Sequence, residues 1–290
     1  MPILVALLVA IVVSAVAFGI AARRSRATDV ADVRVNPHTS DAAIASKQSA
    51  LRQFLRQRGD PTTETGILLT IAVAGVAAAI LIIGALLELI SKHAGFARLD
   101  DSAARFGARH ATPDTTTLLK VVTSFGSTPV IAGIVVVVGV QQYVQHRKKA
   151  APLFLVAAVV SAVAVGNLVK VIVHRARPDV ARLVGAYGSS FPSGHSTAAA
   201  ATYAALALLF GRHRSRKVQA TLAAAAGSIA IAVAASRVLL GVHWLTDVIA
   251  GLLLGWTCFA LCSMAFGGRI LRFGQPVEAA NESAPGPRRV

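Results

Sequence analysis

Charged residues are scarce in this sequence, and their scarcity excludes an ordinary soluble domain. Only 14% of the 290 residues are Asp, Glu, Lys or Arg, whereas a soluble domain carries about a quarter. Hydrophobic residues make up 55% of the chain and come in long uninterrupted runs, without a helical or strand period. Because such runs are typical of membrane spans, we expect an integral membrane protein.

Cysteine is rarer still, which argues against disulfides and structural metal sites. Cys258 and Cys262 are four residues apart inside one apolar run. A helix would place them on one face, a poor geometry for pairing. No His or Cys nearby completes a metal site. We therefore expect both thiols to serve packing.

Acidic residues are also few, 13 against 29 Lys and Arg, which leaves a net charge of +16. No zinc-finger spacing or RNA-binding motif accompanies this charge, so nucleic acid is not the expected partner. The basic residues instead gather between the apolar runs, as they do in membrane proteins.

Seven apolar segments predict an all-α, polytopic membrane bundle, since each approaches the length of about 20 residues that spans a bilayer. They are 3–22, 66–90, 118–140, 151–173, 195–211, 218–236 and 244–266. The expected organisation is a retained transmembrane anchor and basic linker (1–65), a six-helix core (66–266) and a disordered tail (267–290).

Basic residues also predict the orientation of this bundle. The linker, the loops 143–150 and 211–217, and the tail together hold 19 of the 29 Lys and Arg residues. The positive-inside rule places them in the cytoplasm. The loops 91–117 and 174–194, and the turn from Arg237 to His243, then share the outer face.

The first polar motif is LVKVIVHRARPD, residues 168–179. Lys170, His174 and Arg177 are spaced by four and three residues, so a helix would place them on one face, and Pro178 would mark its end. Lys170 lies about two turns inside an apolar run, where an unpaired ammonium costs several kcal/mol, so we expect it to be functional.

Two further arginines of this region, Arg175 and Arg182, have a plainer interpretation. Long basic side chains near the end of a membrane span commonly reach for lipid headgroups. We expect both to do so.

The second motif is PSGH, residues 192–195. Ser193 suits an N-cap, Gly194 allows close backbone approach, and the start of a helix binds anions, phosphate especially. His195 stands beside these groups and could donate a proton. An ordinary capped helix with an incidental histidine remains the alternative.

The third motif is SRVLLGVHWLTD, residues 236–247. His243 and Asp247 are four apart, and a carboxylate beside an imidazole fixes its tautomer, which defines the other ring nitrogen as a nucleophile or base. Arg237 adds a fixed planar cation. The alternative is a His–Asp pair that merely solvates two polar groups at a helix end.

Together the motifs predict a phosphate site with a nucleophile and a general acid, since phosphoryl transfer needs charge neutralisation and alignment. Near the motifs, Asp179 and Asp247 are the only carboxylates. Two are few for a Mg²⁺ cluster. We therefore expect no metal or other cofactor, and a phosphohistidine intermediate.

The three motifs resemble those of the type 2 phosphatidic acid phosphatase (PAP2) superfamily, in the same order and over about 66–266. They read K-x6-R-P (Lys170, Arg177, Pro178), P-S-G-H (192–195) and S-R-x5-H-x3-D (Ser236, Arg237, His243, Asp247). Residues 98–127 are also similar to the stretch that precedes the motifs in bacterial members. The span and linker up to residue 65 lie outside the shared core.

The resemblance implies a role for each matching residue. His243 would attack phosphorus, Asp247 would orient it, and His195 would protonate the leaving oxygen and then help to activate water. The phosphate oxygens would be held by Lys170, Arg177, Ser193, the Gly194 amide and Arg237.

The predicted function is that of a lipid phosphatase of the plasma membrane, with its active site on the extracytoplasmic face. Undecaprenyl diphosphate is the favoured substrate, beside phosphatidic acid and phosphatidylglycerol phosphate. A lipid phosphotransferase is the alternative enzyme. A non-enzymatic transporter is the rival of another class, although no internal repeat or paired broken helices indicate one. The oligomeric state is not predicted.

Overall fold

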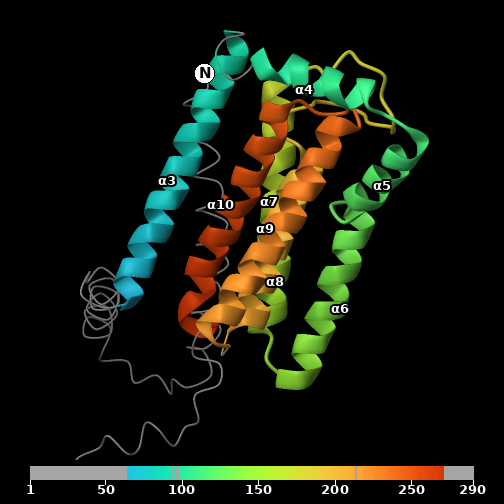
Figure 1. The fold of residues 1–290 in the computed structure, drawn as a ribbon. Helices are drawn as coiled ribbons and strands as arrows, with labels where there is room; N and C mark the ends of the chain where they lie inside the picture. The colour runs from blue at the N-terminus through green and yellow to red at the C-terminus, as the bar shows by residue number, and fades with distance from the viewer. Residues whose placement is uncertain (1–63, 93–94, 96–97, 213, 271–290) are drawn as a thin grey trace, which may run out of the picture.

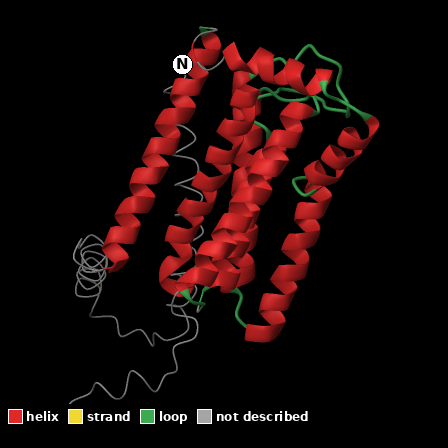
Figure 2. Ribbon diagram, viewed as in Figure 1, coloured by secondary structure: helices red, strands yellow, loops and turns green. Residues whose placement is uncertain are grey.

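The structure is a computed structural model that describes residues 64–92, 95, 98–212 and 214–270. These residues form helices and no strand (Figure 2). The helices are α3 (Glu64–Ser91), α4 (Arg98–Arg109), α5 (Pro113–Ser124), α6 (Thr128–His146), α7 (Ala150–Val173), α8 (Gly194–Gly211), α9 (Arg216–Leu239) and α10 (Leu245–Ile270). The predicted first span, the linker and the end of the tail lie outside the described residues.

Six long helices, α3 and α6 to α10, run side by side in one bundle (Figure 1). Among the described residues, α3, α6, α7, α9 and α10 are long and apolar enough to cross a membrane. Helix α8 has 18 residues and opens on polar side chains, and it packs against α7, α9 and α10. The expected all-α, multi-pass membrane bundle is confirmed.

The predicted single span at 118–140 is wrong, because the chain breaks there into α5 and α6. Ser127 precedes α6 in an extended conformation, and a proline follows within its first turn. A proline is tolerated there because those amides have no helical partner. A Cβ at Gly126 would lie 2.5 Å from Val233 Cγ1. The break thus lets the chain approach α9 closely, and the stretch long and apolar enough to cross a membrane is Thr128–His146.

Two glycines of α10 set its distance from α8. A Cβ at Gly255 would lie 2.2 Å from the Thr197 carbonyl oxygen, and one at Gly251 would lie 2.7 Å from that of Ser193. Small residues four apart let two helix backbones touch in a membrane bundle. As a result, the Ser193 amide donates to the Asp247 carbonyl oxygen at 3.0 Å, which joins the second motif to the third.

The interior of the bundle is apolar and includes both cysteines. Cys258 and Cys262 are buried and form no disulfide, in agreement with a packing role. The Ser161 hydroxyl lies 3.7 Å from Cys262 Sγ, which satisfies a polar group in the core.

The connections that carry the motifs lie at one end of the bundle. The loop between α7 and α8, the turn between α9 and α10, and helix α4 meet there (Figure 1). Helix α4 buries Asp100, Ala104 and Gly107 against this end. A Cβ at Gly107 would lie 2.7 Å from the backbone of Leu239, so α4 rests directly on the end of α9.

Candidate active site

The first motif does not form one continuous helix face. Helix α7 ends at Val173, and His174 takes a left-handed conformation with φ 48°. The expectation that Lys170, His174 and Arg177 share a face is therefore wrong. His174 is exposed, and Arg177 lies in the following loop. Backbone carbonyls of that loop and of the turn before α10 accept hydrogen bonds from Arg177.

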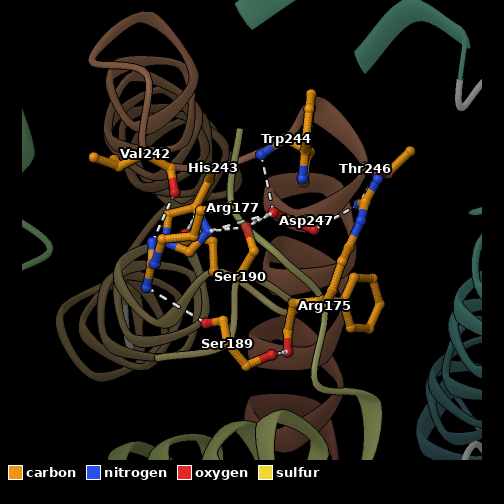
Figure 3. Close-up of polar contacts among 12 residues, drawn as sticks. Arg175, Arg177, Ser189, Ser190, Val242, His243, Trp244, Thr246 and Asp247 are labelled. Atoms are coloured by element: carbon orange, nitrogen blue, oxygen red, sulfur yellow. Dashed lines mark hydrogen bonds and ion pairs between the residues drawn. The ribbon is translucent and has the colours of Figure 1, made fainter. Parts of the chain in front are cut away.

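Arg177 ties the α7–α8 loop to the turn before α10. Its Nε donates to Gly188 O at 3.1 Å, and its Nη2 donates to Tyr187 O at 2.8 Å and Ser189 O at 3.4 Å. Its Nη1 donates to Val242 O at 2.7 Å (Figure 3). Burial lowers the pKa of Arg177, and the charge of Asp247 opposes that effect.

His243 lies between Arg177 and Asp247. Arg177 Nη1 is 3.3 Å from His243 Nε2. Because a guanidinium can only donate, Nε2 must carry the lone pair. The ring proton then lies on Nδ1, which is 3.5 Å from Asp247 Oδ2. His243 lies in the turn before α10 and not on the helix, yet the predicted His–Asp pair is formed.

Asp247 is fully buried and accepts several hydrogen bonds. Its Oδ1 accepts from Arg175 Nη1 at 2.7 Å. Its Oδ2 accepts from the Trp244 amide at 2.9 Å and from the Ser190 hydroxyl (Figure 3). A carboxylate in the first turn of a helix that accepts a hydrogen bond from the N-cap amide forms one half of a capping box. Asp247 is therefore fixed in position as well as charged.

Arg175 does not reach for headgroups, so that prediction is wrong. Its side chain is 15% exposed and bridges two carboxylates, Asp247 and, through Nη2 at 2.7 Å, Asp100 Oδ2. Its guanidinium also lies 5.3 Å from the centre of the Trp244 ring. Arg182 is exposed and takes no part in this arrangement.

Asp100 and Ser190 are site residues that sequence reasoning missed. The signal for Asp100 was present: it falls on the same face of a short helix as Ala104 and Gly107, where a carboxylate must have a partner. Ser190 had no comparable signal, since its contacts depend on the path of an irregular loop.

The start of α8 lies beside Lys170. Ser193 is the N-cap in an extended conformation, as predicted, but its side chain makes no capping bond. Its hydroxyl accepts from Ser196 at 3.0 Å. A Cβ at Gly194 would lie 3.7 Å from Lys170 Nζ. The first amides of a helix have no intrahelical partner, so this end combines free donors with an ammonium.

Arg237 and His195 lie next to these groups. Arg237 is buried, and its Nη1 donates to Thr123 Oγ1 at 3.1 Å. Among the described residues its buried Nε has no hydrogen-bond partner. His195 interacts electrostatically with a set of groups that comprises Arg237, His243, Lys170 and Arg177. The structure therefore gathers the predicted site residues at one end of the bundle.

Burial lowers the pKa of His243 to about 4. The hydrogen bond and charge of Asp247 oppose this shift, while the cations Arg177 and Arg237 add to it. At neutral pH the ring is therefore uncharged, and its Nε2 lone pair is present.

The carboxylates at the site are already bound to cations. Asp100 and Asp247 both contact Arg175. In the part of the chain that the structure describes, no three His, Cys, Asp or Glu side chains gather as a metal site. The donor set is thus suited to an anion.

Comparison with known proteins identifies the family. The model of the PAP2 superfamily matches residues 151–270. Phosphatidylglycerophosphatase B of Bacillus subtilis (strain 168) is 34% identical over 156 residues, which cover 53% of this chain and 76% of that protein. The chain belongs to the PAP2 superfamily. The resemblance drawn from the three motifs is thereby confirmed.

Other members of the PAP2 superfamily match over shorter stretches. Lipid A 1-phosphatase of Rhizobium johnstonii is 38% identical over 117 residues, covering 34% of this chain and 44% of that protein. The crystal structure of a transmembrane PAP2 type phosphatidylglycerolphosphate phosphatase from Bacillus subtilis superposes with a TM-score of 0.63 at 28% identity, covering 69% of this chain and 98% of the other. The bundle described above is thus a PAP2 fold.

Proposed function

We propose that this protein is a membrane lipid phosphatase that hydrolyses a lipid phosphomonoester or diphosphate through a phosphohistidine on His243. The observation that carries the proposal is the state of His243. Its Nε2 lone pair is directed toward the Arg177 guanidinium, while Asp247 lies behind Nδ1. A nucleophile backed by a carboxylate and facing a cation is arranged to attack an anionic phosphorus centre.

The proposed reaction has two steps. In the first, His243 Nε2 bonds to phosphorus, the bond to the lipid oxygen breaks, and His195 gives its proton to that oxygen. In the second, His195 accepts a proton from water, whose oxygen attacks phosphorus and releases His243. The cations Lys170, Arg177 and Arg237 would neutralise the phosphate oxygens in both steps. The Nε of Arg237 supports this role, since it finds no acceptor in the described part of the chain and a phosphate oxygen would supply one.

Several features support a lipid substrate that arrives from the outer face. The motif loops close one end of a membrane bundle, and Tyr187 in the α7–α8 loop is 93% exposed there. The distribution of basic residues favours an extracytoplasmic position for this end. Undecaprenyl diphosphate, phosphatidic acid and phosphatidylglycerol phosphate all present the required group. The name of the Bacillus relative adds support for the last of these.

The test is phosphate release from these three lipids by purified protein in detergent with EDTA. We expect release from at least one lipid without added metal, because the site's carboxylates are held by Arg175 and the phosphate would meet cations. Absence of release from every lipid, or full dependence on Mg²⁺, would contradict the proposal.

The pH dependence of His243 offers an independent prediction. Protonation removes the Nε2 lone pair, so kcat/KM of the free enzyme should fall as the pH drops through the pKa of this ring. We expect that midpoint near 4, below the ordinary value of 6.5, because the ring is buried. ¹⁵N NMR of histidine-labelled protein, with the signal assigned by His243→Gln, measures it directly. A midpoint at 6.5 or above would show that burial does not lower the pKa of this ring.

A further inference from the structure

We propose that Asp100 is a positioning residue for the His243–Asp247 pair and acts through Arg175. Its carboxylate neutralises the Arg175 guanidinium, so that the negative charge of Asp247 remains available to His243. This inference rests on the proposed phosphatase function. It assigns helix α4, outside the three sequence motifs, an indirect part in the chemistry, through Arg175.

The contacts of Asp100 form a closed set around the start of α10. Its Oδ2 accepts from Arg175 Nη2 at 2.7 Å and from the Thr246 hydroxyl at 2.7 Å. Its Oδ1 accepts from the Thr246 amide at 2.8 Å. Arg175 Nη1 in turn donates to Thr246 Oγ1 at 2.6 Å and to Asp247 Oδ1 at 2.7 Å. Asp100 is 3% exposed, so water does not replace these partners.

The charges of this set explain why a second carboxylate is needed. Asp247 alone with Arg175 would make a neutral pair, and a neutral pair gives His243 little electrostatic support. With Asp100 included, two carboxylates and one guanidinium leave one negative charge beside the imidazole. A phosphorylated or protonated His243 ring is positive, so this charge stabilises the state that forms during turnover.

Other charged groups that face His243 are cations. Arg177 lies 3.3 Å from Nε2, and Arg237 interacts with the ring electrostatically. The single net negative charge on the Nδ1 side of His243 therefore partly offsets the positive charges of these arginines. Asp100 therefore matters at a distance, although the structure places no atom of it against His243.

Asp100 also has a structural role, which the test must separate from the electrostatic one. Its Oδ1 binds an amide in the first turn of α10, as a helix-capping acceptor does. Asp100→Asn keeps a carbonyl oxygen for that amide and removes the charge. Asp101→Asn is the matched control, because Asp101 is the next residue on α4 and its side chain is 64% exposed.

We expect Asp100→Asn to lower kcat about tenfold and to leave KM within about twofold, since one charge is lost beside the nucleophile and none near the phosphate oxygens. Asp101→Asn should match the wild type. The double variant Asp100→Asn/Arg175→Gln restores the net charge beside His243 and should recover kcat to within about threefold. A purely structural role predicts the opposite, with the double variant below both single ones.

Ligand binding supplies a readout that does not depend on turnover. Vanadate can bond to His243 as a phosphoryl-transfer analogue, whereas inorganic phosphate depends on the surrounding cations. By calorimetry we expect Asp100→Asn to weaken the binding of vanadate about tenfold and to change the binding of phosphate little.

The outcomes separate the two proposals. An active wild type whose Asp100→Asn variant keeps full kcat, or loses activity through KM, overturns the positioning role and leaves the phosphatase intact. If the wild type is inactive and binds vanadate no more tightly than phosphate, the proposed phosphatase function is wrong, and the positioning role with it.

Discussion

His243→Ala is expected to abolish turnover, lowering kcat by about 10,000-fold or more, while inorganic phosphate still binds. In the proposed mechanism, the variant removes the nitrogen that would attack phosphorus. The guanidinium of Arg177 remains held by Tyr187 O and Val242 O, so the anion site keeps its shape. Initial rates of phosphate release and calorimetric titration with phosphate measure the two properties separately.

His146→Ala is the matched control, since this histidine is exposed and ends α6 at the other end of the bundle. It should behave as the wild type in both measurements. If His243→Ala kept substantial turnover, the phosphohistidine mechanism would be wrong. Phosphate transport into vesicles that survives His243→Ala, with no hydrolysis by either protein, would favour a transporter.

Gly255→Ala should have the largest effect on stability, about 3 kcal/mol, and should also reduce activity. The new methyl group would lie 2.2 Å from the Thr197 carbonyl oxygen and 2.9 Å from Ala200 Cβ. Backbone atoms cannot rotate away as the end of a side chain can, so α8 and α10 must separate. That movement would pull the start of α8 away from Asp247.

Thermal unfolding in detergent measures the expected loss. Gly227→Ala provides the control, because a Cβ at this glycine of α9 would meet no atom of the described residues within 4 Å. There the substitution should be neutral or slightly stabilising, as alanine favours helix. Equal unfolding temperatures for the two variants would show that α8 and α10 are not held by close backbone contact.

The helical bundle and the grouping of the motifs could be predicted because both depend on local sequence. Apolar runs of membrane length give helices, and topology brings alternate connections to one end. The split between α5 and α6 was only partly predicted: Gly126 and Pro129 interrupt the apolar run 118–140, but such an interruption can also be tolerated within one span. At the break, Gly126 packs closely against Val233, more than a hundred residues away.

Arg175 shows where residue-by-residue reasoning fails. Arginine near the end of a span usually reaches for headgroups, and that rule considers the side chain alone. Its actual partners are Asp100, which lies 75 positions earlier, and Asp247, 72 positions later. The sequence contains both carboxylates but does not show that they converge on one guanidinium.

Arg177 uses every one of its N–H groups within the protein. All of its N–H directions are taken by loop carbonyls and by the Nε2 of His243. The Arg177 guanidinium therefore lies against His243 Nε2, the nitrogen that is proposed to attack phosphorus. In the proposed reaction a phosphate, with several anionic oxygens, would compete for that guanidinium and uncover the nitrogen as it binds. The substrate itself would then act as the trigger of its own hydrolysis.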